Sequence, residues 1–401
     1  MKIAVVAFVD FDQYSAAKSR VQLLARGLAL RGHEVHVVLP IRYTSGPLYT
    51  VSEGLHVHWG ISVRTDSIAR SRLEGRLGLL LLVKRLCAAR LDWLVLYNMG
   101  IEGVLMLAIA SAYGVKVASE YCDVWSPPLA PNVYKWTRYL SHELGMKLIS
   151  RHANLNIVIS KFIEAKVTQI APTRKTILIP QLVDCEKFRY DQSAALLCRN
   201  KWKIGSDFII AYILSHYHYN GLRLLMSACA LLASEGESFK LLISGAPSSY
   251  GECDDAVELV SYYNLSDRTI LTGWIPLDEV IPTMCAANCL VLPKLNHIAN
   301  LAAGPTVLAE YLAMGRPIVA TRVGDISMYV HDEEDVLLCE PEIVSLANQI
   351  RRIIHDHALR QTLEFNARNA ALKHFDYRIA GELLDLSLSQ SLSIGPEIPG
   401  I

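Results

Sequence analysis

The sequence has no excess of either charge and few charged residues of any kind. Among its 401 residues, 39 Lys and Arg balance 39 Asp and Glu, and charged residues make up 19%. A protein that binds nucleic acid through the phosphates needs a basic surface, so no nucleic acid partner is expected. The apolar fraction of 52% is in turn too high for an intrinsically disordered chain.

Long hydrophobic runs are also missing, although the mean hydropathy of +0.25 is high for a soluble enzyme. A membrane-spanning helix needs roughly 18 or more consecutive apolar residues. Leu77–Val83 ends at two basic residues, and Gly103–Ala118 is broken by polar residues and a glycine. The first residues, MKIAVVAFVDFDQ, contain too short an apolar run for a signal peptide and predict a strand beginning at residue 2.

The nine cysteines include no Cys-x-x-Cys pair. Their odd number and scattered spacing argue against a disulfide framework or a structural zinc site, and they fit a reducing cytoplasm. Cys285 and Cys289 are spaced one helical turn apart, but no second pair of ligands accompanies them, which favours a buried helix face. We therefore expect a cytoplasmic protein with no metal and no cofactor.

Glycine is absent from the loop Val9–Ala17, which follows the first predicted strand. A dinucleotide-binding loop needs glycines there so that the backbone can approach the pyrophosphate. A Walker loop is missing as well. The sequence therefore disfavours an NAD- or FAD-dependent oxidoreductase and an NTPase.

Short β-branched runs alternate with longer helical segments along the chain, which predicts an α/β fold with parallel sheets. Predicted strands cover residues 3–8, 34–39, 56–59, 93–97, 115–121, 156–160, 176–180, 208–214, 240–244, 269–272, 289–292 and 317–320. We expect two doubly wound, Rossmann-like domains, residues 1–190 and 205–375, separated by a polar stretch around 191–205. A final helix, residues 376–393, would cross back to the first domain. Ligands of such sheets bind at the carboxyl ends of the strands, so the cleft between the two edges is the expected site.

The segment Gly304–Thr321 is the most informative in the chain. It predicts a loop, a helix with Pro305 in its first turn, a glycine stop and a buried strand. The free amides of Thr306, Val307 and Leu308 would suit a pyrophosphate. Glu310, one turn further on, could accept hydrogen bonds from ribose hydroxyls, or it could simply pair on an ordinary helix.

This segment resembles the donor-site helix of family 4 retaining glycosyltransferases of the GT-B type. Other segments agree with that family in order and spacing: Leu28–Leu39, Asp123–Trp125, Ala153–Ser160, Ile179–Phe188, Leu265–Pro276 and Arg322–Asp325. The resemblance implies transfer of a sugar from a nucleotide-sugar donor, with retention of anomeric configuration and without a metal. It also implies that Glu310 binds the ribose and that the backbone near Gly273 and Trp274 contacts the base.

The chain departs from the family pattern around the donor phosphates and sugar. Ala302 occupies the position of the family's first glutamate, and Val307 replaces the lysine of one family variant. The family's Arg and Lys, which clamp the diphosphate, are both absent from Leu214–Gly221. The nearest substitutes are His216, His218 and Arg223, although the histidines could equally be packed loop residues.

On the acceptor side, the resemblance points to the end of the fifth predicted strand. Cys122 stands where the family often has a histidine, and Asp123 could accept a hydrogen bond from an acceptor hydroxyl or cap the next loop. The first loop, with Asp12, Ser15 and Ala16, would line the same edge. The acceptor would be a glycan, a lipid-linked sugar or a small molecule.

A basic, leucine-rich stretch lies between Arg64 and Arg90. Such a helix could dock on a membrane surface, which would make the protein peripheral at the inner membrane face. Alternatively, it could bury its leucines in the core and leave its arginines in solvent.

Three functions remain open at this point. The first is a glycosyltransferase that builds a polysaccharide, a glycolipid or a glycosylated metabolite. The second is a non-catalytic glycosyltransferase-like binding or regulatory partner, which the missing cations and Ala302 would favour. A sugar-nucleotide epimerase of similar shape is the third, and no acid/base pair for it is evident.

Overall fold

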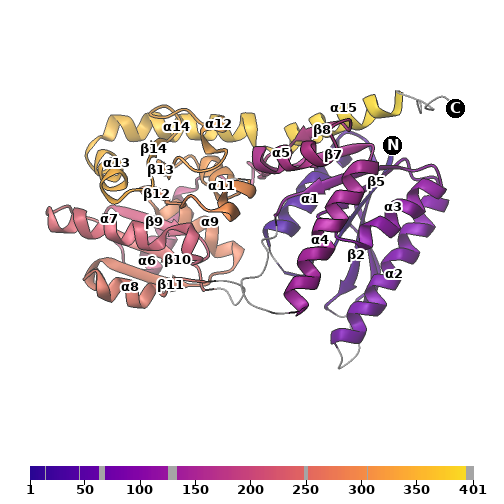
Figure 1. Ribbon diagram of the computed structural model, residues 1–401. Coiled ribbons are helices and arrows are strands. Elements are labelled where there is room, and N and C mark those ends of the chain that lie inside the picture. The colour runs from indigo at the N-terminus through magenta and orange to yellow at the C-terminus, as the bar shows by residue number, and fades with distance from the viewer. Residues whose placement is uncertain are drawn as a thin grey trace. The chain divides into compact units, whose positions relative to one another are not determined.

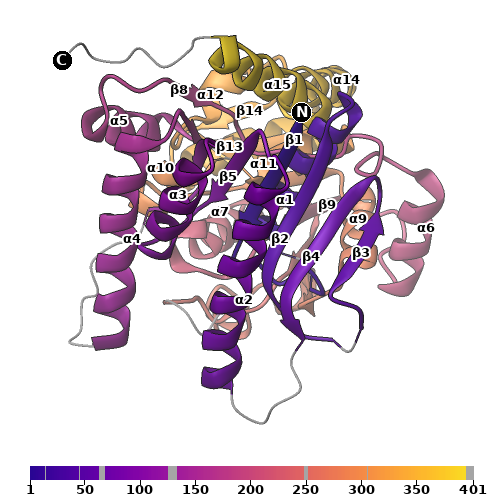
Figure 2. The ribbon, with the colours of Figure 1, turned by 90° about the vertical axis from the view of Figure 1, so that its right-hand side faces the viewer.

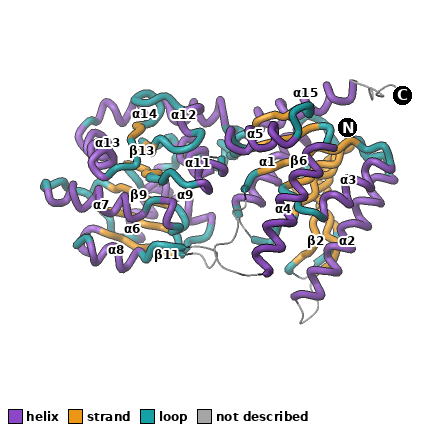
Figure 3. The backbone as a smooth tube through the Cα atoms, in the orientation of Figure 1, coloured by secondary structure: helices purple, strands orange, loops and turns teal. Residues whose placement is uncertain are grey.

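The computed structural model describes residues 1–13, 15–44, 46–62, 68–124, 133–247, 252–304 and 306–393. It divides into two compact units, of which the first contains Met1–Leu182 and Tyr377–Ile401 and the second contains Val183–Asp376. Each unit has strands enclosed by helices (Figure 3). The two units are described separately below.

The first unit is built on a sheet with the order β3-β4-β2-β1-β5-β6-β7-β8. All neighbouring strands are parallel except the pair β3 and β4, which is antiparallel. The strands are β1 (Lys2–Ala7), β2 (Glu34–Arg42), β3 (Tyr49–Ser52), β4 (Leu55–Ser62), β5 (Trp93–Tyr97), β6 (Lys116–Tyr121), β7 (Leu155–Val158) and β8 (Thr176–Leu178). The helices are α1 (Ala16–Leu30), α2 (Ile68–Ala88), α3 (Glu102–Ala112), α4 (Val133–His152), α5 (Lys161–Ile170) and α15 (Tyr377–Ser393). Figure 1 shows α2, α3 and α4 next to one another, and Figure 2 shows β3 and β4 at one edge of the sheet.

The second unit has a fully parallel sheet with the order β11-β10-β9-β12-β13-β14. Its strands are β9 (Ile209–Ile213), β10 (Lys240–Ser244), β11 (Thr269–Gly273), β12 (Cys289–Leu292), β13 (Ile318–Thr321) and β14 (Leu337–Cys339). Its helices are α6 (Gln192–Lys201), α7 (Leu222–Ser234), α8 (Ala256–Tyr262), α9 (Leu277–Ala286), α10 (Ile298–Ala302), α11 (Thr306–Met314), α12 (Ile326–Tyr329), α13 (Ile343–His355) and α14 (His357–His374). Short 3₁₀ turns cover His218–Asn220 and Ser266–Arg268. The α/β class with two parallel sheets is thus confirmed.

The strands are apolar because helices cover both faces of each sheet. Every residue of β5, β9, β12 and β13 is buried. A sheet that is buried on both faces needs continuous apolar strands, which explains the high mean hydropathy. Within the described ranges, no helix is long and apolar enough to cross a bilayer.

Helix α1 shows how local sequence sets the limits of an element. The Ser15 hydroxyl accepts a hydrogen bond from the Lys18 amide at 3.1 Å and caps the helix. Val21, Leu24 and Leu28 form its buried face. Gly32, with φ of +83°, continues the chain after the helix in the left-handed conformation that glycine adopts at little cost.

Three details differ from the sequence predictions. The stretch around 191–205 is not only a linker, because α6 forms there from the Asp191 cap onward and packs on α9. The first unit also ends at Leu182, earlier than residue 190. Cys285 and Cys289 do not share a helix, since the extended backbone at Ala287 ends α9 and Cys289 begins β12.

Helix α15 belongs to the first unit, where it packs against α1. A Cβ atom built on Gly381 would lie 2.5 Å from the backbone of Gly27, and one built on Gly27 would lie 2.7 Å from the Tyr377 carbonyl oxygen. Only glycines allow the two helices to approach this closely. Residues at least 350 positions apart in the sequence are therefore joined in one unit.

Candidate functional site

The topology of each sheet marks one position for a ligand. The chain fills one side of β9 with β10 and β11 and then crosses to place β12 on the other side. Such a reversal opens a crevice at the carboxyl ends of the two central strands, which is where open α/β sheets bind ligands. In the second unit this point lies between the loops that follow β9 and β12, and in the first unit between those that follow β1 and β5.

Helix α11, which carries Glu310, is held next to β9. The buried Tyr311 hydroxyl accepts a hydrogen bond from the Ile213 amide at 3.0 Å. Leu308, on the same helix, is fully buried. Val307 and Glu310 are half-buried on the same helix. Thr306 begins α11, while Pro305 lies outside the described residues. The structure therefore fixes the first turn of α11 and Glu310 near the end of β9.

The loop after β9 and the first turn of α7 contain the three cationic candidates, but these have different surroundings. His216 is buried, with both ring nitrogens unpaired among the described residues. Burial lowers its pKa, and the nearby Asp254 and Asp255 raise it only in part. The exposed His218 Nδ1 and Arg223 Nε lie 3.3 and 3.8 Å from the same Asp254 oxygen. Two of the three candidates are therefore already compensated by a carboxylate.

Gly273 is the last residue of β11, and Trp274 follows it at the carboxyl edge of the second sheet. Gly273 has φ of +67°, and its carbonyl oxygen accepts a hydrogen bond from the Gly245 amide at 3.0 Å. The Trp274 side chain is 73% exposed. An exposed indole is available for stacking against a planar ring.

Lys294 is a candidate that the sequence analysis missed. It follows β12, is 92% buried (8% exposed), and burial lowers its pKa to about 8. Pro293 separates Lys294 from the last residue of β12, and a charged residue placed after an apolar strand and a proline is the signal that could have found it.

In the first unit, Asp123 lies exposed at the end of β6. The Asn98 amide donates to its carboxylate at 3.4 Å, and the His142 ring lies 3.4 Å from the Asn98 oxygen. Desolvation raises the pKa of Asp123. This row of three polar side chains, running from α4 through β5 to β6, was not foreseen from the sequence.

Cys122 has a different environment from Asp123. It is buried, and its thiol lies 3.9 Å from a Glu120 oxygen. Burial raises the pKa of this thiol, so it stays protonated. Of the two candidates on this strand, only Asp123 is accessible to a ligand.

A buried ion pair supports this end of β6. The Arg20 guanidinium in α1 donates to Glu120 at 2.7 Å, to the Pro180 carbonyl at 2.6 Å and to the Ile179 carbonyl at 3.0 Å. Both side chains are almost wholly buried. Each hydrogen bond offsets part of the cost of burying the charges.

Hydrogen bonds hold the first loop to the residues that follow β2 and to the start of α1. Asp12 accepts hydrogen bonds from the Thr44 amide and hydroxyl at 3.0 and 2.9 Å. Ser15 caps α1, and Ala16 begins that helix with an exposed side chain. Trp125 lies outside the described residues.

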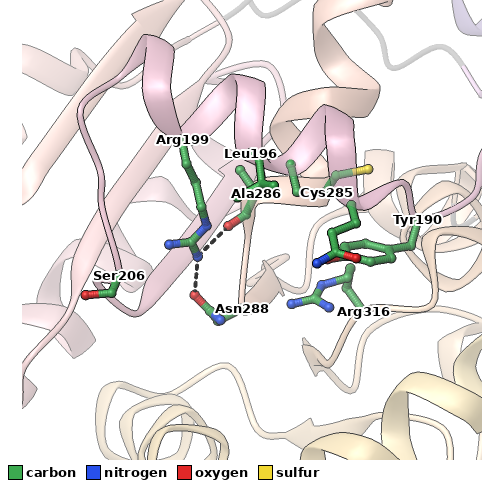
Figure 4. Close-up of a pocket in the computed structure, with 10 residues that line it drawn as sticks. Tyr190, Leu196, Arg199, Ser206, Cys285, Ala286, Asn288 and Arg316 are labelled. Atoms are coloured by element: carbon green, nitrogen blue, oxygen red, sulfur yellow. Dashed lines mark hydrogen bonds between the residues drawn. The ribbon is translucent and has the colours of Figure 1, made fainter.

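A separate cavity of about 230 Å³ lies at the opposite, amino-terminal edge of the second sheet (Figure 4). Its Arg199 donates to the Ala286 carbonyl and the Asn288 side chain at 2.8 and 2.7 Å. Its Arg316 pairs with Glu364 at 2.9 Å and stacks on Tyr190. Both guanidinium groups already have protein partners.

Across the described parts of the chain, no three His, Cys, Asp or Glu side chains come together in a way that could hold a metal ion.

Comparisons with known proteins place both units. Residues 15–181 match the family described as glycosyl transferase 4-like domain, and residues 207–356 match the family described as glycosyl transferases group 1. Sucrose-phosphate synthase from Thermosynechococcus elongatus superposes with a TM-score of 0.74 at 21% identity, over 98% of this chain and all of that one. The chain has the GT-B fold. One of the two matched segments lies in each unit.

Two other GT-B structures are similar. HepE of Anabaena, solved in complex with UDP, has a TM-score of 0.72 at 18% identity, over 97% of this chain and all of that one. WaaG, a glycosyltransferase involved in lipopolysaccharide biosynthesis, has a TM-score of 0.68 at 16% identity, over 96% and 99% of the two chains.

Curated relatives match over shorter segments. The 2-deoxystreptamine glucosyltransferase of Streptomyces kanamyceticus is 24% identical over 237 residues, which is 58% of this chain and 56% of that protein. The capsular polysaccharide biosynthesis glycosyltransferase CapM of Staphylococcus aureus is 23% identical over 204 residues, 51% of either chain. These alignments thus span about half the length of the relatives.

Proposed function

We propose that this GT-B chain is a glycosyltransferase that moves a hexose or a related sugar from a nucleotide-sugar to a hydroxyl group of an acceptor. The observation that carries this proposal is the position of α11 at the reversal point of the second sheet, with Glu310 one turn inside it. The match of that unit to glycosyl transferases group 1 supports it. The relatives that bind UDP or act as glucosyltransferases make UDP-glucose the first donor to try.

In this proposal the second unit binds the donor. The amides of Thr306, Val307 and Leu308 face the diphosphate, because a helix N-terminus carries free donors and a partial positive charge. The Glu310 carboxylate accepts hydrogen bonds from the ribose hydroxyls. The base lies along the backbone at Gly273, beside the exposed Trp274.

The first unit holds the acceptor, which is a glycan, a lipid-linked sugar or a small molecule. Asp123 accepts a hydrogen bond from the attacking hydroxyl, and Asn98 fixes the carboxylate that does so. The loop with Asp12, Ser15 and Ala16 lines the same edge of the first sheet. This assignment makes Asp123 a positioning group for the acceptor oxygen.

The proposed reaction retains the anomeric configuration and needs no metal. The bond between the anomeric carbon and the diphosphate oxygen breaks, and the acceptor oxygen bonds to the same face of the sugar. The departing diphosphate oxygen takes the acceptor proton. The protein then contributes mainly by orienting the reactants and by stabilising the charge on the leaving group.

Calorimetric titration with UDP-, GDP-, dTDP- and CMP-linked sugars tests the donor site. One nucleotide should bind saturably, and Glu310→Ala should weaken it about tenfold or more, since hydrogen bonds to a carboxylate are lost. Glu258→Ala, an exposed carboxylate on α8, is the matched control and should bind like the parent chain. If none of the nucleotides binds, the transferase proposal fails and the non-catalytic partner becomes the better account.

Peripheral contact with an anionic membrane surface is a further part of the proposal. Helix α2 buries Leu79 and Val83 but leaves Leu73, Leu77 and Leu81 between 54% and 68% exposed. Helix α4 adds an exposed apolar set: Val133, Tyr134, Trp136, Leu140 and Leu144. The two helices both pack on α3.

Basic side chains accompany these exposed apolar groups. They are Arg76, Lys84 and Arg85 of α2 and Lys135 and Arg138 of α4, all exposed. Apolar side chains interleaved with cations suit the interface of an anionic bilayer. Arg64 lies outside the described residues, as do the side chains of Arg70 and Arg72.

Co-sedimentation with phosphatidylglycerol-containing vesicles tests this contact. The parent chain should bind these vesicles more tightly than neutral ones, and Leu77→Gln/Leu81→Gln should bind about tenfold less. Leu196→Gln/Leu197→Gln, exposed leucines on α6, provide the matched control. Equal binding by the two double variants would rule out α2 as the docking helix.

A further inference from the structure

Lys294 is a buried cation without a compensating charge. Its side chain is 92% buried, and no carboxylate among the residues that the structure describes lies within ion-pair distance of it. Its carbonyl oxygen accepts a hydrogen bond from the Thr321 hydroxyl at 2.6 Å. This bond fixes the backbone but provides no partner for the ammonium group. Burying an ammonium group in this way is costly, so packing alone does not account for a lysine here.

Lys294 lies at the reversal point of the second sheet. The loop after β9 is hydrogen-bonded to the segment that follows β12. The Tyr219 carbonyl accepts hydrogen bonds from the Leu295 amide at 2.9 Å and from the Asn300 amide group at 2.7 Å. A Cβ atom on Gly221 would lie only 1.8 Å from the Pro293 carbonyl oxygen, so the two backbones touch. Lys294 thus stands in the segment that borders the crevice where an open α/β sheet binds its ligand.

The other basic side chains that follow β9 do not supply an uncompensated positive charge. Burial lowers the pKa of His216, which leaves its ring neutral, and both ring nitrogens are unpaired among the described residues. His218 and Arg223 share the carboxylate of Asp254. Lys294 and His216 are therefore buried hydrogen-bond donors at this point that remain available to a ligand, and Asp254 Oδ2 is a buried acceptor without a partner among the described residues.

We propose that Lys294 is the cation that binds the diphosphate of the nucleotide, a role supplied from the end of β12 and not from the loop after β9. The proposal rests on the proposed function and names the group that holds the leaving diphosphate. An anion placed beside the ammonium group would offset its cost of burial, and a lysine serves phosphate as a compact point charge. The neutral His216 ring can donate a hydrogen bond to the same diphosphate.

Lys294→Met and Lys294→Gln test this role by calorimetry with the nucleoside diphosphate that the parent chain binds best. Both variants should bind it about 10- to 100-fold more weakly, because a charge-assisted hydrogen bond is lost. Lys240→Met, at the amino end of β10 in the same sheet, is the matched control and should leave the affinity unchanged. Thermal unfolding without nucleotide should occur at the same or a higher temperature in Lys294→Met, since a buried cation has been removed.

The outcomes separate this inference from the proposed function. If the parent chain binds a nucleotide and both Lys294 variants bind it equally well, the inference is wrong while the donor site stands. A parent chain that binds no nucleotide overturns both. If both variants unfold at a clearly lower temperature, Lys294 has a structural role and the inference also fails.

Discussion

At the residue scale, burial determines which side chains near the candidate sites carry a charge. Lys294, His216 and Cys122 are all buried, and burial shifts the pKa of each toward the neutral form. For Cys122 this leaves an inert thiol. For Lys294 and His216 it leaves groups whose unmet hydrogen-bonding capacity is explained by a ligand.

His142 gives a prediction about pH at this scale. Burial lowers the pKa of its ring from 6.5 to about 4. The folded chain thus resists a proton that the unfolded chain accepts, so the contribution to stability is complete above pH 6.5 and is lost as the pH falls toward 4. The loss amounts to at most about 3 kcal/mol.

Urea unfolding at a series of pH values measures this effect. His142→Gln should lose less stability than the parent chain between pH 6.5 and 4. His152→Gln, at the exposed end of the same helix, should follow the parent chain. Parallel curves for the parent chain and His142→Gln would contradict the assignment.

The sequence was informative about single residues only where their neighbours in the sequence define the environment. The position of Glu310 one turn into α11 follows from local order. The partners of His218 and Arg223 do not, because Asp254 reaches them from beyond β10. Lys294 was not predicted as a site residue, because its burial depends on contacts with the loop after β9, which is distant in the sequence.

At the element scale, the contact between α1 and α15 is the tightest test of packing. Gly27 and Gly381 bring the two helix backbones together. Gly381→Val should lower the free energy of unfolding by roughly 1–3 kcal/mol, because the added carbons overpack the contact. Valine is the better helix former, so any loss must come from packing.

Denaturant unfolding compares this variant with Leu386→Val, which places valine on an exposed position of the same helix. The control should stay within about 0.5 kcal/mol of the parent chain. If Gly381→Val is as stable as the control, the helices do not depend on this close approach.

Element types were largely predictable from the sequence, whereas some short or exposed elements were not. Apolar runs between turn residues gave most strands, but β3 (Tyr49–Ser52) is short and exposed and has no such run. Helix α6 has exposed leucines and a polar composition, so its sequence looked like a linker. Its packing on α9 decides its structure, and that contact is not local.

At the scale of the whole molecule, two parallel sheets each provide one reversal point at their carboxyl edges. The second sheet gathers α11, Glu310, His216 and Lys294 around that point. The first gathers Asp123, Asn98 and His142 at the ends of β5 and β6. The alternation of strands and helices was enough to predict two such sheets, but not which side chains their loops would leave unpaired.

Hydrogen exchange with and without the best-bound nucleoside diphosphate shows where the nucleotide binds. We expect protection in the second unit, over residues 214–221, 293–295 and 306–312. Protection confined to the cavity around Tyr190–Arg199, or to the first unit alone, would contradict a donor site at the carboxyl edge of the second sheet.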